Sequence, residues 1–384
     1  MHVLVVTVVH HPEDARILHR QIAALLDRGH TVTYAAPFTA RGATPRPDVE
    51  AVDLPRATGR DRRAAVRAAR RMLDARGPAA DVVLLHDPEL LLALPGALRH
   101  WRRIGARRPA VVWDVHEDTA AAVAMKGWVP RALRPPMRLA VRAAERIAER
   151  HLHLLLAEDA YQGRFRRIHP VVPNLVTVPP GTPVPPGDDR VVYLGQLSRA
   201  RGTEELIAMA RLLAPEVRVE VIGAADGDVR ALLSAADRDG VLRWHGFLPN
   251  DEALGRLRGA LAGMSLLRDE ANYRHSRPTK VVEYMAYGIP VVSTPNPLAA
   301  ELVEAHDCGL LVPYEDPSAA AAAVRKLRAE PELRDLMGAR GHAAALSGLN
   351  WPDRAGEFVA GLEDWAAAAA AAATRPGAAA VSSR

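Results

Sequence analysis

The chain has 384 residues, more than one hydrophobic core usually supports, so two domains are expected. The net charge of +5 suggests a nucleic-acid partner, but there is no Gly-rich Walker loop and few aromatic residues accompany the arginines, which disfavours that class. The only cysteine, Cys308, excludes an internal disulfide and a cysteine-ligated zinc site.

Apolar runs of strand length alternate with helical patterns through the first half of the chain. Near-continuous apolar strands are buried on both faces, which indicates a parallel sheet covered by helices. Strands are predicted at residues 3–9, 31–36, 82–86, 111–115 and 152–157, and helices at 16–28 and 62–76.

A Pro-rich segment then interrupts the pattern, and no helix or strand can run through it. The alternation restarts with strands at 191–194, 217–222 and 242–246 and a helix at 204–213. The domain prediction is therefore an N-terminal α/β domain at 1–178, a linker at 179–189, a second α/β domain at 190–350, a last helix at 351–365 and a disordered tail at 366–384.

The most informative stretch is RPTKVVEYMAYGIPVVST, residues 277–294, which predicts a loop, a helix, a Gly turn and a buried strand. Pro278 suits the first helical turn. The free amides at Thr279 and Lys280, with the Lys280 charge, predict an anion site that fits a diphosphate. Glu283 follows one turn later, where its carboxylate could accept from vicinal hydroxyls. An ordinary capped amphipathic helix is the alternative.

This segment is similar to the donor-binding motif of retaining glycosyltransferases of family 4, and the likeness extends over roughly residues 1–365. It implies an α/β protein with the GT-B fold: two doubly wound, Rossmann-like domains, a cleft between them and a C-terminal crossover helix. Two glutamates seven residues apart hold the donor in that family; Glu283 matches the second, and His275 replaces the first. The expected donor-binding residues are Gly195, Gln196, Arg201, His275, Pro278, Thr279, Lys280, Val281 and Glu283.

The loop after residue 194 reads GQLSRARG. Gly195 lets a ligand approach the backbone, and Arg201 can chelate a phosphate. Family 4 usually has an Arg and a Lys near these places; here they are Gln196, which can only offer a hydrogen bond, and Arg201. A surface arginine in an Arg-rich chain is the alternative for Arg201.

Polar clusters follow two strands of the first half, at positions where ligands bind in this architecture. His116 matches the family's histidine near the donor sugar, and Glu117 and Asp118 are candidates for acceptor hydroxyls. Asp87 is expected to line the cleft, or else to form only a turn. A hydrogen-bonded structural residue is the alternative for His116. With Arg201 and Lys280, His116 completes the predicted catalytic set.

The first loop reads HHPEDAR, residues 10–16. It resembles a family 4 branch with His-Pro and Asp-x-Arg here, which makes His11, Asp14 and Arg16 acceptor-side candidates. Asp14 could instead simply cap the helix. Adjacent histidines can suggest a metal, but His10 and His11 point opposite ways if extended, and we predict no metal.

The resemblance implies transfer of a sugar from an NDP-sugar, UDP- or GDP-linked, to an acceptor hydroxyl with retention, in glycan, glycolipid or natural-product biosynthesis. The co-substrate is the NDP-sugar, and no cofactor is expected. No carboxylate stands out as a nucleophile, which favours a front-face route. The alternatives are a nucleotide-sugar epimerase of similar fold and a nucleotide-sugar-binding protein that has lost catalysis.

No apolar run reaches a membrane span, and the chain begins as a strand without a secretory signal, so we expect a cytoplasmic protein. Arg-rich segments at 99–108 and 131–150 could touch anionic lipid on the inner face of the membrane. A solvated face in an Arg-biased chain is the favoured interpretation, and weak peripheral membrane contact is the alternative. The sequence does not predict an oligomeric state.

Overall fold

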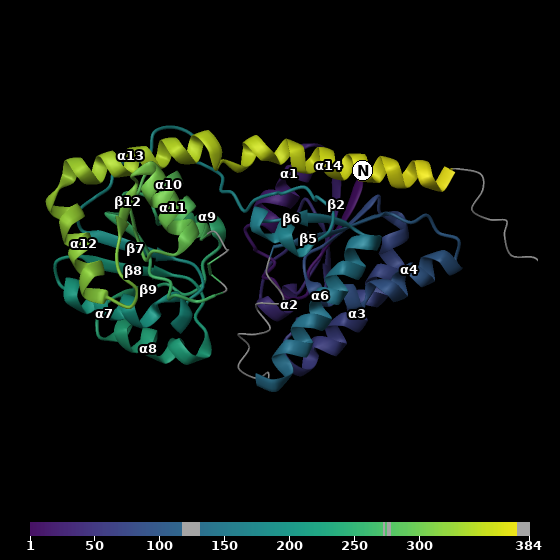
Figure 1. Ribbon diagram of the computed structural model, residues 1–384, viewed down its shortest axis with the longest axis horizontal. Coiled ribbons are helices and arrows are strands. Elements are labelled where there is room, and N and C mark those ends of the chain that lie inside the picture. Colours follow the sequence, from purple (N-terminus) through teal and green to yellow (C-terminus); the bar gives the residue numbers. More distant parts are fainter. Residues whose placement is uncertain (117–130, 272, 275–277, 375–384) are drawn as a thin grey trace, which may run out of the picture. The chain divides into compact units, whose positions relative to one another are not determined.

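The computed structural model describes residues 1–116, 131–271, 273–274 and 278–374. The chain divides into two compact units, Met1–Pro173 with Asp353–Arg384, and Asn174–Pro352. Each unit contains one parallel six-stranded sheet with helices on both faces (Figure 1). The Glu117, Asp118 and His275 candidates lie outside the described residues.

The first unit has the strand order β3-β2-β1-β4-β5-β6. Its strands are β1 (His2–Val6), β2 (Thr31–Ala36), β3 (Glu50–Asp53), β4 (Val82–Leu85), β5 (Ala110–Val115) and β6 (His153–Leu156). Its helices are α1 (Ala23–Asp27), α2 (Phe38–Arg41), α3 (Arg62–Arg76), α4 (Leu94–Arg103) and α6 (Arg134–His151), with short helical turns at Gly59–Asp61, Gly77–Ala79, Pro88–Leu92, Arg131–Leu133 and Asp159–Arg164.

The second unit repeats this arrangement, with the order β12-β11-β10-β7-β8-β9. Its strands are β7 (Arg190–Leu194), β8 (Arg218–Ile222), β9 (Arg243–Trp244), β10 (Ala262–Ser265), β11 (Val291–Ser293) and β12 (Gly309–Leu311). Its helices are α7 (Thr203–Leu213), α8 (Gly227–Arg238), α9 (Asn250–Gly255), α10 (Thr279–Ala286), α11 (Pro297–His306), α12 (Pro317–Ala329) and α13 (Pro331–Gly348).

Both sheets follow the doubly wound strand order, in which successive strands are added first toward one edge of the sheet and then toward the other. The order of addition reverses between two central strands, β1 and β4 in one unit and β7 and β10 in the other. The apolar runs form central strands because both faces of each sheet are covered. In β7, Val191 and Tyr193 pack in one core cluster, and Val192 and Leu194 pack in another on the opposite face. In this architecture a ligand binds at the carboxyl ends of the strands, next to the point where the strand order reverses.

The Pro-rich segment packs against the second unit. The Gly187 N–H donates to Gly259 O at 3.0 Å. A Cβ at Gly288 would lie 2.8 Å from Pro183 Cγ, so the chain passes closely over the end of α10. The linker predicted at 179–189 has no regular structure, but these contacts attach it to one unit.

The final helix, α14 (Trp351–Thr374), is longer than predicted. The disordered tail expected from residue 366 was wrong as far as Thr374, because the alanine run has the highest helix propensity of any residue type. In the first unit, Glu363 Oε1 lies 2.8 Å from His30 Nε2, and the Trp365 ring stacks on His153 at 4.6 Å. These contacts hold the helix against the first sheet.

Candidate functional site

The predicted anion site lies at the start of α10 in the second unit. Pro278 is extended, with φ −73° and ψ 104°, and precedes the helix as its N-cap, whereas we expected it in the first turn. The Val281 N–H donates to Pro278 O at 3.0 Å. Asn174 Nδ2 donates to Thr279 Oγ1 at 3.2 Å, which holds the first helical residue. The amides of Thr279 and Lys280 lack acceptors within the helix, as the first amides of a helix do.

Lys280 is buried beside these amides, with only 6% of its surface exposed. Its Nζ lies 3.5 Å above the centroid of the Tyr193 ring and has no hydrogen-bond partner among the described residues. Burial, followed by the charge of Arg201, lowers the pKa of Lys280 well below its usual value, while Glu283 opposes the shift. Three ammonium donors are therefore left for a ligand, and an anion would relieve the cost of burying them.

Gly195 keeps the space next to Lys280 open. It directly follows β7 and has a φ of 118°, which favours glycine. A Cβ placed there would lie 3.7 Å from Lys280 Cε and 3.8 Å from Nζ. Gln196 is exposed, and its Nε2 donates to Asp226 Oδ1 at 2.7 Å. The Gln196 side chain is thus engaged with the neighbouring loop and not with Lys280.

Arg201 lies in a short helical turn, Arg199–Arg201, in front of α7. Its guanidinium carbon is 5.8 Å from the Tyr273 ring centroid. The next residue, Gly202, has a φ of 76°, and a Cβ there would lie 1.8 Å from Leu266 O. Glycine is required at this close approach, which fixes the loop that carries Arg201. Glu283 is buried one turn along α10 from Lys280.

In the first unit, three histidines meet beyond the carboxyl ends of neighbouring strands. His10 follows β1, His86 follows β4 and His116 follows β5. His116 Nε2 lies 2.8 Å from His10 Nε2, and the His86 and His116 ring centroids are 6.0 Å apart. Burial, followed by the charge of His10, lowers the pKa of His116 to about 3. His116 is therefore neutral at physiological pH.

Asp87 is fully buried and fastens the first loop. Its Oδ2 accepts from Thr7 Oγ1 at 2.9 Å and from the backbone N–H groups of Val8 and Val9. Its Oδ1 lies 3.3 Å from His10 Nε2. Asp87 had been predicted to line a cleft or form a turn; its contacts position the backbone after β1 and the His10 ring.

Asp114, inside β5, binds the two ends of a π-helical turn, Ile17–Ile22 with its flanking residue Arg16. Arg16 Nε and an Arg16 terminal nitrogen each donate to Asp114 at 2.7 Å, and Gln21 Nε2 donates at 2.9 Å. The Gln21 N–H donates to Arg16 O, five residues back, which brings both side chains to Asp114. Burial opposes ionisation of Asp114, but Arg16 outweighs it and holds the pKa of the carboxyl well below its usual range.

These contacts change the predicted roles in the first loop. Asp14 Oδ1 accepts from the backbone N–H groups of Arg16 and Ile17, at 2.9 and 3.1 Å, so the capping alternative describes this carboxylate. The Arg16 guanidinium is buried against Asp114, and its role as a ligand contact stays a prediction. His11 is half-buried and its Nδ1 accepts from the Glu13 N–H at 3.1 Å.

One group of side chains has the spacing of a cation site. The ligand atoms of His86, Asp114 and His116 all lie within 4.8 Å of one another. However, Arg16 already occupies both Asp114 oxygens, and a metal ion there would sit beside a buried guanidinium. The geometry favours a hydrogen-bonded cluster with one buried ion pair.

Comparison with known proteins finds a family match in the second unit. Residues 179–343 match the family model described as glycosyl transferases group 1. The matched residues all lie within the second unit. They include Gly195, Arg201, Lys280 and Glu283, and the switch point of their sheet coincides with the start of α10 and the end of β7.

Curated relatives match part of the chain. The D-inositol 3-phosphate glycosyltransferase of Corynebacterium jeikeium is 31% identical over 204 residues, which cover 44% of this chain and 48% of the relative. The chain spans less than half the length of the curated relatives it matches in this way.

Solved structures match nearly the whole chain. Sucrose-phosphate synthase of Thermosynechococcus elongatus superimposes with a TM-score of 0.71 and 18% identity, covering 96% of this chain and 99% of that one. Anabaena HepE, solved in complex with UDP-glucose, gives 0.66 and 14%, covering 95% and 100%. These likenesses confirm the predicted GT-B fold, with its two parallel six-stranded sheets.

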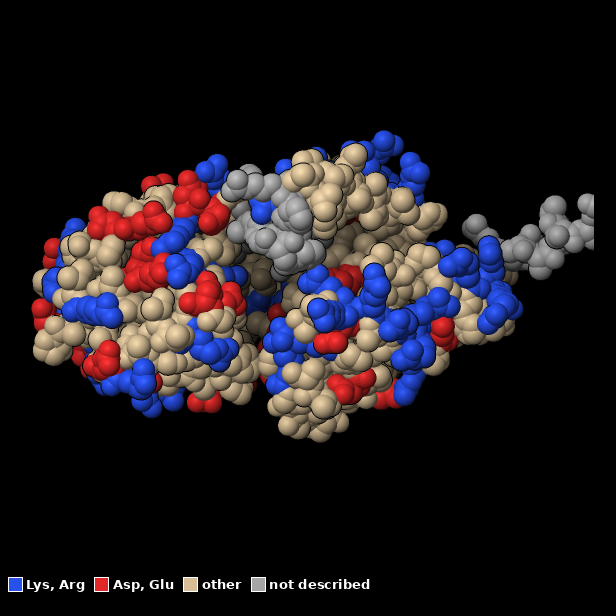
Figure 2. Space-filling model, turned by 90° about the horizontal axis from the view of Figure 1, so that it is seen from below, with Lys and Arg blue, Asp and Glu red and all other residues tan. Residues whose placement is uncertain are grey.

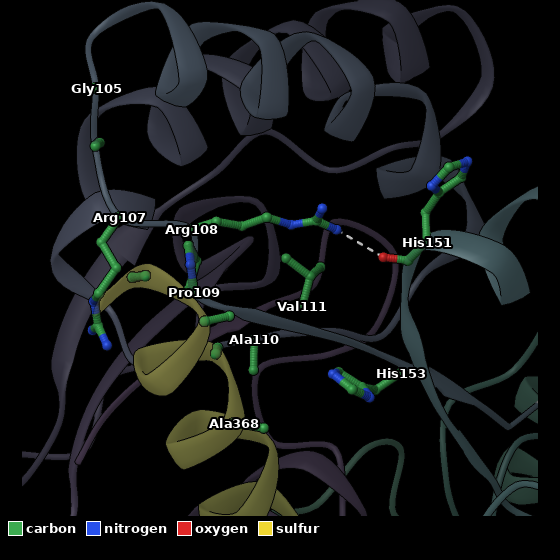
Figure 3. Close-up of a pocket in the computed structure, with 13 residues that line it drawn as sticks. Gly105, Arg107, Arg108, Pro109, Ala110, Val111, His151, His153 and Ala368 are labelled. Carbon is green, nitrogen blue, oxygen red and sulfur yellow. Dashed lines mark hydrogen bonds between the residues drawn. The ribbon is translucent and has the colours of Figure 1, made fainter. Parts of the chain in front are cut away.

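A cavity of about 660 Å³ in the first unit shares no lining residue with either candidate site (Figure 3). It is lined by residues 105–111, by His151 and His153, and by alanines of α14. Arg108 donates to His151 O at 2.8 Å across its rim, and Arg107 pairs with Asp81. The cavity meets the amino-terminal ends of β5 and β6, whereas the anion site of the second unit and the histidine cluster place their polar groups at carboxyl ends.

Sequence reasoning missed several of these residues. Tyr193 and Asp114 lie inside predicted strands and read as core positions, and only the tertiary contacts with Lys280 and Arg16 reveal their roles. His10 was considered only as a metal ligand. The available signal was that β1, β4 and β5 are consecutive in a doubly wound sheet, so polar residues after them must converge.

Proposed function

We propose that this protein is a retaining glycosyltransferase that moves a sugar from a nucleotide-sugar donor to an acceptor hydroxyl, without a metal ion, in the biosynthesis of a glycan, glycolipid or natural product. The observation that carries the proposal is Lys280: a buried ammonium, unpaired among the described residues, at a helix N-terminus within the segment that matches glycosyl transferases group 1.

The donor diphosphate is proposed to bind between the end of β7 and the first turn of α10. Lys280 and the amides of that turn would contact its oxygens, and Gly195 would admit it close to the backbone. Arg201, whose charge acts on Lys280, would supply a second cation. Glu283 would accept from hydroxyls of the donor, as in the family 4 motif that it matches. Anabaena HepE binds UDP-glucose on this fold, which supports a UDP-sugar as the first donor to test.

Catalysis would rest on stabilisation of the leaving diphosphate. Fixed cations and amides stabilise developing negative charge without reorganising during the reaction. The leaving phosphate would accept the proton of the attacking hydroxyl, so retention needs no covalent intermediate. His116, neutral at physiological pH, would donate or accept one hydrogen bond to the sugar and carry no charge to compete with the cations. The first unit is proposed to bind the acceptor through its strand-end polar residues.

Donor binding is the first test. Thermal-shift screening of UDP-, GDP-, ADP- and TDP-sugars should give a rise in melting temperature with one nucleotide family, since a ligand that binds only the folded state stabilises it. Calorimetry on Lys280→Ala and Glu283→Gln should then show weaker binding, while Lys326→Ala, which changes an exposed lysine of α12, should match the wild type. Equal donor affinity in all of these proteins would place the site elsewhere.

Turnover distinguishes the remaining alternatives. A transferase releases the nucleoside diphosphate in proportion to glycosylated acceptor. Release of free UDP without an acceptor, together with an epimerised sugar, would indicate the epimerase. Donor binding without any turnover across acceptor classes would indicate a binding protein.

A further inference from the structure

Helix α6 of the first unit buries its acidic residues. A surface helix normally packs its apolar stripe on the core and exposes its charges. In α6, the buried residues are Glu145, Ala148 and Glu149, although the helix is 18 residues long. The residues turned to the interior are therefore mostly acidic, and its apolar side chains lie elsewhere.

The carboxylates of the two glutamates are balanced by hydrogen-bond donors inside the unit. Glu145 Oε1 accepts from an Arg164 terminal nitrogen. Glu149 Oε1 accepts from the backbone N–H groups of Arg166 and Arg167, at 2.8 and 2.7 Å, and lies 3.1 Å from His169 Nε2. Their negative charge is used to hold the segment that follows β6, and it does not reach the outer face of the helix.

The outer face of α6 combines arginines with exposed apolar side chains. Leu139 is 71% exposed and Ile147 is 58% exposed, with Ala143 between them at a spacing of four residues. Side chains spaced by four lie on one helical face, so these three form a row. A second exposed row begins one residue earlier and has the same spacing of four residues. It consists of Arg138, Arg142, Arg146 and Arg150.

None of these four arginines has a hydrogen bond or an ion pair with another described residue. Figure 2 shows Lys and Arg side chains gathered over the underside of the first unit, which is where Figure 1 places α6 and α3. In α3, Arg63, Arg67 and Arg71 are exposed as well. The outer face of α6 is thus part of a wider positive surface.

We propose that the outer face of α6 is a docking surface for an anionic lipid membrane. Arginines without partners would bind lipid phosphates, while Leu139 and Ile147 would enter the level where headgroups meet acyl chains. Arginine suits this place because its aliphatic stem can lie along apolar surface while the guanidinium reaches the phosphates. None of the helices described is both long and apolar enough to cross a bilayer.

The pattern fits a lipid surface better than an acidic protein. Protein interfaces have an apolar centre depleted of charge and a polar rim. Here an arginine row at residues 138–150 runs beside an apolar row at residues 139–147, which is the arrangement of a helix that lies in a membrane interface. The inference goes beyond the proposed transfer reaction and does not involve Lys280, so either can fail without the other.

The test is flotation of the full chain with vesicles of phosphatidylcholine alone and of phosphatidylcholine with an equal part of phosphatidylglycerol. We expect binding to the anionic vesicles, weakened by salt because screening reduces attraction between separated charges. An arginine near an anionic surface contributes about fivefold in affinity. The double variant Arg142→Gln/Arg146→Gln should therefore bind about 25-fold more weakly.

The matched control is Arg211→Gln/Arg238→Gln, which removes two exposed helical arginines from α7 and α8, also without partners among the described residues. It loses the same net charge as the α6 double variant, but its arginines lie outside the α6 face, so it should bind like the wild type. Leu139→Ser/Ile147→Ser should weaken binding at high salt, where the apolar contribution remains. All variants should retain the wild-type melting temperature, because the changed side chains are exposed.

Three results would overturn the proposal. The first is a wild-type chain that does not float with anionic vesicles, and the second is equal binding by the α6 and control double variants. If Leu139→Ser instead dissociates a dimer seen by light scattering, the face joins two copies of the chain and the lipid proposal is wrong.

Discussion

Replacement of Lys280 by methionine should stabilise the protein and weaken donor binding at the same time. The Lys280 ammonium is buried without a hydrogen-bond partner among the described residues, and an unsatisfied buried donor destabilises the fold by about 1–3 kcal/mol, more when charged. The cation–π contact of the ammonium with the Tyr193 ring stabilises the fold by about 0.5–2 kcal/mol. The first effect is larger because an ammonium has three donors, so the free energy of unfolding should rise by about 1 kcal/mol.

Methionine is the informative substitution because it keeps the length of the side chain and a favourable sulfur contact with the Tyr193 ring. For a unit of this size, about 1 kcal/mol corresponds to a rise in melting temperature of about 2–4 °C. Loss of one charge-assisted hydrogen bond of about 1.5–3 kcal/mol should weaken donor binding by about 10- to 150-fold. Lys326→Met is the control, because Lys326 is exposed and should change neither quantity.

The stability gain should depend on pH in a defined direction. Folding lowers the pKa of Lys280 below its ordinary value of 10.5. Between those two pKa values the unfolded chain holds a proton that the folded chain has lost, so wild-type stability rises with pH there. The advantage of Lys280→Met should thus be largest below the folded pKa and shrink toward pH 10.5. A lower melting temperature for Lys280→Met, or an unchanged donor affinity, would refute this account.

Three further changes test the framework of the two sites. Arg16→Met leaves the Asp114 carboxylate buried and unpaired, and urea denaturation should show a loss of about 3–5 kcal/mol; an unchanged midpoint would argue against the ion pair. Gly202→Ala forces a left-handed φ and a Cβ 1.8 Å from Leu266 O, so thermal melting should show a loss of at least about 1–3 kcal/mol. The His116 ring, with a pKa of about 3, should show no change in its NMR shifts from titration between pH 5 and 8; a midpoint in that range would contradict a neutral buried histidine.

The sheets were predictable where the strands are long and apolar. Runs such as residues 31–36 and 111–115 were found because both faces of a central parallel strand are buried. The strands β3, β10 and β12 were missed, since each is short and carries few β-branched residues. In β10, Gly263 is glycine because a Cβ would lie 2.2 Å from the Tyr284 ring, a tertiary contact that no local pattern reports.

The two candidate sites also differ in how far the sequence predicts them. The second site could be predicted because Thr279, Lys280 and Glu283 lie in one continuous segment with a helix start. The first site depends on residues from three strands and on a π-helical turn, and the sequence signal for such a turn is weak. The pairing of Arg16 with Asp114, which is distant in sequence, could therefore not be predicted.

The two units share a strand order, but charged groups are paired at the first switch point and, within the part of the chain that the structure describes, a buried cation is unpaired at the second. This difference supports the separate acceptor and donor roles proposed for the two units. At the first switch point, Arg16 is paired with Asp114, the Asp87 carboxylate is bound by backbone N–H groups, and His116 is neutral. Such a surface offers hydrogen bonds without uncompensated charge, which suits a hydroxyl acceptor. At the second switch point, Lys280 is buried without a partner among the described residues, and the only strong relief for it is an anion. If the proposed function is correct, the diphosphate must therefore bind the second unit, and reversing the charge at Lys280 should abolish donor binding while leaving acceptor binding to the first unit intact.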